Sequence, residues 1–137
     1  FKNEKIQRSH WIKTAGGSSI AVNQLHKIFK KKKIKNYELV KDDVLKTIPK
    51  YIKKNPNLKI SLLNVDIDFV ETTQCVLENF YDKVCKNGII LFDNYEGIGT
   101  GGTFYKGETA VINSFLKKIK KKVIKFPFFN RPSYIIK

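Results

Sequence analysis

Apolar residues recur along the chain in two alternating patterns, one typical of helices and one typical of buried strands. Helical spacing predicts helices over residues 20–33, 44–54 and 71–85 and from 108 onward, the first preceded by a loop and cap at 16–19. Continuous or short apolar runs predict strands at 37–40, 59–65 and 88–94. Two extended runs, 123–126 and 133–136, close the chain and are separated by a proline-containing turn.

This order of elements predicts an α/β fold. Strands separated by helices need crossover connections, so we expect a Rossmann-like, mostly parallel sheet. The strands at 59–65 and 88–94 are apolar throughout, which predicts helices on both faces of the sheet. The last two runs are too close together for a crossover and predict a C-terminal antiparallel hairpin. A length of 137 residues fits one domain, 1–137.

Composition narrows the class of protein. The chain is 42% hydrophobic and 28% charged, as globular proteins are. No apolar run approaches the ~20 residues of a membrane span, and the first residues lack the apolar region of a signal peptide. Cys75 and Cys85 are the only cysteines, and on a shared helix they would lie too far apart for a disulfide. A reducing, cytoplasmic setting fits this pattern best.

The net charge of +15 is distributed unevenly. Residues 1–60 carry 16 Lys or Arg against four Asp or Glu, whereas residues 61–110 carry three against eight. The lysine runs at 30–33 and 117–122 end predicted helices, where cations complement the helix dipole. We interpret them as solvated helix ends, with a nucleic-acid or anionic-membrane patch as the alternative. Only two of the basic residues are arginine, which disfavours nucleic-acid recognition.

The acidic middle segment holds the candidate chemistry. Asp66 and Asp68 follow the strand at 59–65, and Asp93 and Asn94 end the strand at 88–94. In open α/β sheets ligands bind at the carboxyl ends of the strands. Oxygen donors converging there, without cysteine or histidine, suit a hard cation such as Mg²⁺. The alternative is that these aspartates cap the helices that follow, as Asp68 could do for the helix at 71–85.

Four segments taken together carry a family resemblance: ISLLNVDID, the helix start ETT, the strand GIILFDN and the helix start GET. They resemble the C-terminal half of class I S-adenosylmethionine-dependent O-methyltransferases, most closely the macrocin O-methyltransferase group, which acts on sugar hydroxyls. The resemblance runs from about Trp11 to the last residue. It includes ELVKDDVLKTIP and the terminal SYIIK.

The resemblance implies a metal site. Asp66 stands at the family's first metal-binding aspartate, and Asp93 and Asn94 stand at the acidic pair after the next strand. This chain has Asp-Asn where macrocin-type members have Asp-Asp, and it is similar in this to the more distant catechol O-methyltransferases, which have Asp-Asn. Those enzymes carry a lysine base where this chain has Phe69, so Asp66 is expected to accept the proton.

The resemblance also implies a cofactor site. Asp43 matches the family's aspartate near the adenine of S-adenosylmethionine, although the preceding residue, normally glycine, is Asp42. The glycine-rich turn that binds the cofactor is absent from this sequence. We therefore expect that the N-terminal part of the fold is missing from it and that the fragment alone is inactive.

The resulting hypothesis is a divalent-metal-assisted O-methyltransferase acting on a hydroxyl of a small, sugar-containing acceptor. The many lysines favour an anionic sugar derivative as that acceptor. The alternatives are a lysine-rich nucleic-acid-binding α/β module and a non-catalytic fragment of the methyltransferase fold. The sequence is compatible with a homo-oligomer and does not decide the oligomeric state.

Overall fold

The computed structural model describes residues 20–96, 106–129 and 131–137. The chain folds as two compact units, Phe1–Asp42 and Asp43–Lys137. No helix in these described ranges is both long enough and apolar enough to cross a lipid bilayer. The predicted N-terminal loop and cap at 16–19 and most of the glycine-rich segment at 96–107 lie outside the described residues.

The first unit contains the helix α2 (Val22–Lys31), which confirms the helix predicted there and places its last lysines in the final turn. The predicted strand at 37–40 is wrong, because this segment has no strand structure. Tyr37 instead packs back against α2. Its hydroxyl lies 2.7 Å from Nδ1 of His26, and its ring meets Phe29 edge-on at 4.4 Å between centroids.

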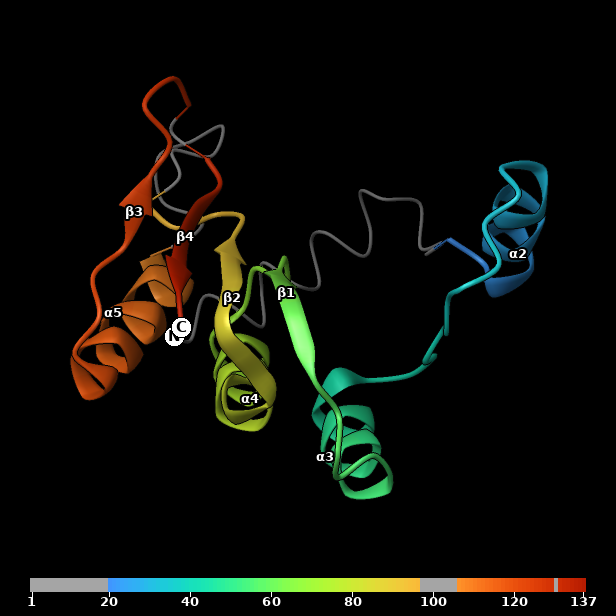
Figure 1. Cartoon of the computed structure of the whole chain (residues 1–137), viewed down its shortest axis with the longest axis horizontal. Helices are drawn as coiled ribbons and strands as arrows, with labels where there is room; N and C mark the ends of the chain where they lie inside the picture. Colours follow the sequence, from blue (N-terminus) through green and yellow to red (C-terminus); the bar gives the residue numbers. More distant parts are fainter. Residues whose placement is uncertain (1–19, 97–105, 130) are drawn as a thin grey trace. The chain divides into compact units, whose positions relative to one another are not determined.

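The second unit is an α/β structure, as predicted. Its elements are α3 (Val44–Lys54), β1 (Ile60–Val65), α4 (Val70–Phe80), the 3-10 turn η1 (Tyr81–Lys83), β2 (Val84–Phe92), α5 (Lys106–Ile119), β3 (Ile124–Lys125) and β4 (Ser133–Ile136). The strands form one sheet in the order β1-β2-β4-β3 (Figure 1). β1 and β2 pair in parallel, while β4 is antiparallel to both β2 and β3, which confirms the C-terminal hairpin.

The junction between α4 and β2 differs from its prediction. The helix ends at Phe80 and the strand begins at Val84, so the segment at 86–88 lies inside a strand and does not terminate a helix. The reason is a long-range ladder: the Asn87 N–H donates to the Lys137 carbonyl at 3.0 Å, and the Lys137 N–H donates to the Gly88 carbonyl at 2.9 Å. The two cysteines consequently sit on different elements, and both are free.

One face of the sheet is buried against helices. α4 packs against α3 and against α5, and the three helices contribute to a single core with the strands (Figure 1). On the opposite face Leu62, Ile89 and Ile136 are 56%, 36% and 41% exposed. The prediction of helices on both faces is therefore not met within the described residues, because the strands bury alternate residues only.

We expect Gly88→Ala to lower the free energy of unfolding by about 1–3 kcal/mol. A Cβ at this buried position would lie 2.7 Å from Cγ1 of Val84 and 2.9 Å from the Cys85 carbonyl oxygen, so the strand must shift. Urea unfolding measures the effect. Ser61→Ala, at an exposed position of β1, is the control and should stay within about 0.5 kcal/mol of the parent. Equal stability of both variants would contradict the expectation.

Candidate functional site

The parallel register of β1 and β2 brings the two predicted aspartates to one edge of the sheet. Val65 pairs with Phe92, and the Asp93 N–H donates to the Val65 carbonyl at 3.1 Å. Adjacent strands lie about 4.8 Å apart. Asp66 and Asp93 directly follow the last paired residues, so their backbones lie side by side. Asp66 is exposed and Asp93 is half-buried, which leaves both accessible to a ligand.

Asp68 belongs to this group, and it is not the helix cap considered from the sequence. The residue at the N-cap of α4 is Phe69, whose side chain makes no capping hydrogen bond. Asp68 instead accepts a short hydrogen bond from Nδ2 of Asn94. Burial raises the pKa of Asp68, and the charges of Asp66 and Asp93 raise it further, against a lowering effect of Arg131. Its φ of 66° is a left-handed value that costs backbone energy, as is common at functional sites.

Asn94 is held at both ends of its amide. The side chain is buried, with 3% of its surface exposed. Its Nδ2 donates to Asp68, and its Oδ1 accepts from Nη1 of Arg131 at 2.9 Å. The oxygen that was predicted to bind a metal ion therefore faces a guanidinium group in this structure.

The segment after β2 is tied to α5. The Tyr95 hydroxyl donates to Oδ1 of Asn113 at 2.8 Å, and the Glu96 N–H donates to Oγ1 of Thr109 at 3.0 Å. Both contacts fix the N-terminal half of α5 beside the carboxyl end of β2. The first turn of α5 contains Glu108.

Glu108 is a site residue that the sequence reasoning missed. It is fully buried, and among the described residues neither carboxyl oxygen has a hydrogen-bond partner. Burial raises its pKa to about 8, with further contributions from Asp68, Asp93 and Asp66 in that order. The sequence signal that could have found it is an acid in the first turn of the helix after the second acidic strand end, where the helix dipole favours negative charge.

The donor chemistry of this carboxylate cluster, defined as Asp66, Asp68, Asp93 and Glu108, suits a hard cation. Burial and the neighbouring acids raise the pKa of Asp68 and of Glu108, and Glu108 has no hydrogen-bond partner in the described structure. As the side chains stand, no three His, Cys, Asp or Glu residues in the described ranges are close enough together to hold a metal ion. A bound cation would therefore have to draw the carboxylates together.

Asp43, the residue predicted to lie near the adenine, caps α3. Its Oδ1 accepts from the Leu45 N–H at 3.0 Å, and its carbonyl accepts from the Thr47 hydroxyl at 3.1 Å. The residue before it, Asp42, has a φ of 131°, in the region that favours glycine. The backbone here thus has a conformation that suits glycine, although this chain has an aspartate.

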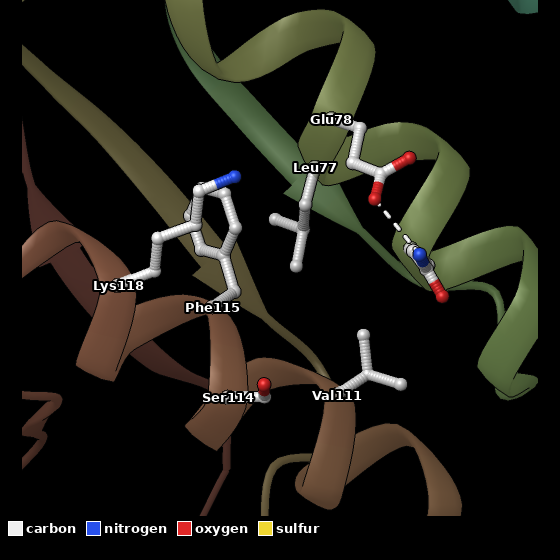
Figure 2. A pocket seen from close by; sticks show the side chains of 7 residues that line it. Leu77, Glu78, Val111, Ser114, Phe115 and Lys118 are labelled. Carbon is white, nitrogen blue, oxygen red and sulfur yellow. Dashed lines mark hydrogen bonds between the residues drawn. The ribbon is translucent and has the colours of Figure 1, made fainter.

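A separate groove lies between α4 and α5 (Figure 2). It has a volume of about 230 Å³. It is lined by Gln74, Leu77, Glu78, Val111, Ser114, Phe115 and Lys118. Nε2 of Gln74 donates to Oε1 of Glu78, one turn further along α4, at 2.8 Å. None of the carboxylate cluster lines this groove, so it is a different surface from the predicted site.

Comparison with known proteins connects the fold to one class of enzyme. No protein-family model and no curated protein matches the chain. Among solved structures, the chain is similar to the apo structure of CalS11, a TDP-rhamnose 3'-O-methyltransferase of calicheamicin biosynthesis, with 28% identity over 72% of this chain and a TM-score of 0.60. A second crystal structure of CalS11, calicheamicin methyltransferase, gives 28% identity over 72% of this chain and a TM-score of 0.62. This chain covers 40% and 36% of those two chains.

We expect the stability of the chain to fall as the pH rises from about 4.5 to about 8, with Glu108 as a main cause. In this range the folded chain keeps the Glu108 proton while the unfolded chain releases it, so rising pH favours unfolding. Glu108→Gln removes this contribution and should flatten the slope. Urea unfolding at several pH values measures it.

Glu78→Gln, at an exposed position on α4, is the matched control and should keep the parent slope. A Glu108→Gln slope as steep as that of the parent would contradict the assignment of this pH dependence to Glu108.

Proposed function

We propose that this protein is an S-adenosylmethionine-dependent O-methyltransferase that methylates a hydroxyl of a small, sugar-containing acceptor with the help of a divalent cation. The observation that carries the proposal is the likeness to CalS11, a sugar O-methyltransferase, combined with acids at two paired strand ends. The sugar part of the proposal follows from what CalS11 acts on. The excess of basic residues favours an anionic acceptor, for example a nucleotide-linked sugar.

The chemistry to be served is methyl transfer from a sulfonium to an alcohol oxygen. The C–S bond of the donor breaks as the new C–O bond forms, and the hydroxyl proton must pass to a base. An unassisted sugar hydroxyl is a poor nucleophile near neutral pH, so the site has to supply a proton acceptor and to stabilise negative charge on oxygen. Carboxylates close to the hydroxyl can accept its proton.

Asp66, Asp93 and Asn94 are the proposed ligands of the cation. When bound, a divalent cation would supply Lewis-acid stabilisation of the oxygen, worth several kcal/mol. The two aspartates support this role by their positions after Val65 and Phe92. Asn94 could contribute only if its Oδ1 exchanged Arg131 for the ion, because that oxygen now accepts from the guanidinium.

Asp66 is the proposed proton acceptor, since it is the exposed acid of the cluster and can meet an acceptor from solvent. Asp68 is a second candidate that the geometry favours. Burial and its acidic neighbours raise its pKa, which makes its carboxylate the stronger base. Its hydrogen bond from Asn94 would hold it in place for that task.

Replacing the proposed ligands should abolish most of the activity. We expect Asp66→Asn and Asp93→Asn each to reduce methyl transfer by about 100-fold or more, because a base or a charge-stabilising ligand is lost. The assay follows the methyl group of labelled S-adenosylmethionine onto a panel of nucleotide-linked sugars, using the protein that contains this chain.

Asp82→Asn, an exposed acid in η1, is the matched control and should keep the parent rate. Normal methylation by Asp66→Asn and Asp93→Asn would refute the assignment of the site. No transfer to any sugar, with transfer to another hydroxyl compound, would refute the sugar acceptor.

We also propose that Asp43 helps to bind the cofactor, in addition to capping α3. Asp43→Ala should cost about 1 kcal/mol of stability through the lost cap, whereas Asp43→Asn keeps a side-chain oxygen for Leu45 N–H and should be almost neutral. If the carboxylate also binds the cofactor, Asp43→Asn should still weaken S-adenosylhomocysteine binding, which calorimetry measures. Unchanged affinity of this variant would assign Asp43 to the cap alone.

A further inference from the structure

The first unit contains a hollow of its own, formed by the C-terminal half of α2 and the segment that follows it. Its volume is about 830 Å³, within the range of sites for small molecules. This basic hollow is lined by His26, Lys30, Lys33, Ile34, Lys35 and Tyr37. Every lining residue belongs to the first unit, so the basic hollow is distinct from the carboxylate cluster of the second.

The end of α2 turns the chain back along the helix. The Ile34 N–H donates to the Phe29 carbonyl at 2.9 Å, and the Lys33 N–H donates to the Lys30 carbonyl at 3.1 Å. This is the Schellman pattern, in which the residue after the C-cap is left-handed and is usually glycine. Here that residue is Lys33, with a φ of 57°. The chain thus has a lysine where the backbone favours glycine, and this lysine lines the basic hollow.

Tyr37 is the aromatic residue of the basic hollow. Its hydroxyl lies 2.7 Å from Nδ1 of His26, and its ring packs edge-on against Phe29 at 4.4 Å between centroids. These two contacts hold Tyr37 to α2, while 37% of its surface stays exposed. An exposed aromatic ring held beside cations is suited to stacking on a nucleobase.

The charge of the basic hollow is positive. Residues 22–37 contain six lysines and no acidic residue. Three of these lysines line the basic hollow, and all three are exposed. The C-terminal end of a helix is equivalent to about half a negative charge, which the three lysine charges exceed. The basic hollow therefore suits an anionic group.

The lining residues favour a small phosphorylated ligand over a nucleic-acid strand. Lysine binds phosphate as a point charge, and several lysines around one hollow match the several charges of a diphosphate. A surface for single-stranded nucleic acid instead follows the backbone along a groove and stacks successive bases on several aromatic rings. Here the lysines surround one tyrosine, and no arginine occurs between residues 20 and 42.

We propose that the basic hollow binds the diphosphate of a nucleotide-linked sugar, with Lys30, Lys33 and Lys35 on the phosphates and Tyr37 stacked on the base. This inference rests on the proposed function for the choice of a nucleotide-linked sugar. It deepens that function by assigning recognition of the charged part of the acceptor to the first unit.

Calorimetry of the 137-residue chain with inorganic pyrophosphate and with thymidine diphosphate tests the inference. The combined variant Lys30→Gln, Lys33→Gln, Lys35→Gln should bind both about tenfold or more weakly, because charged hydrogen bonds to phosphate are lost. Tyr37→Leu should weaken thymidine diphosphate alone, by about tenfold, because base stacking is lost. Tyr37→Phe keeps the ring and should retain the parent affinity for thymidine diphosphate.

The matched control is the combined variant Lys117→Gln, Lys120→Gln, Lys122→Gln, at exposed positions in and after the last turn of α5. It removes the same charge from a different part of the chain. In about 0.15 M salt, charges more than about 8 Å apart are largely screened, so the control should change either affinity by less than about twofold. Circular dichroism of each variant confirms that it is folded.

Equal weakening by the basic-hollow variant and the control variant would overturn the inference, because binding would then follow net charge alone. A parent chain that binds neither pyrophosphate nor thymidine diphosphate would also overturn it. So would binding of a single-stranded oligonucleotide or of phosphatidylserine vesicles in place of thymidine diphosphate. Unchanged affinity of Tyr37→Leu for thymidine diphosphate would refute the stacking.

The proposed function fails separately from this inference. Binding of thymidine diphosphate that depends on Lys30, Lys33 and Lys35, without methyl transfer to any acceptor, supports the basic hollow and refutes the methyltransferase. Methyl transfer to sugars by a chain that binds no diphosphate supports the methyltransferase and refutes the basic hollow.

Discussion

The parallel pairing of β1 with β2 is the constraint on which the candidate site depends. It aligns Val65 with Phe92, two core residues with no exposed surface, so the register cannot slip without exposing them. The residues directly after this pair, Asp66 and Asp93, are thereby set beside each other. Hydrophobic burial on one face of the sheet thus fixes the positions of charged groups at its edge.

Charge then explains why this edge is unusual within the molecule. The lysines gather at helix ends, in the last turns of α2 and α5, where the helix dipole favours them. The acids gather at the strand ends, where burial and acidic neighbours raise the pKa of Asp68 and of Glu108, and Glu108 has no hydrogen-bond partner among the described residues. Arg131 is a basic residue that does act at this edge, through its hydrogen bond to Asn94 and its charge on Asp68.

The sequence was sufficient for features that depend on local pattern. The helices at 44–54 and from 108 onward, the parallel strands and the terminal hairpin were predicted from periodicity and spacing. Contacts between residues far apart in the sequence could not be predicted from it. The hydrogen bonds between the segment at 87–88 and Lys137 place the start of β2 before that segment, and Arg131 donates to Asn94, 37 positions away. The predicted strand at 37–40 failed because a short apolar run forms a strand only beside a partner. The burial of Glu108 likewise depends on how α5 meets the sheet.

The exposed apolar face of the sheet, with Leu62, Ile89 and Ile136, has a practical consequence at the bench. Environment-sensitive dyes brighten wherever they meet hydrophobic surface, whether or not a protein has unfolded. Fluorescence from such a dye would therefore be high for this chain even in its native state. Melting curves for it should be recorded by circular dichroism or tyrosine absorbance, since neither signal depends on a dye adhering to the sheet.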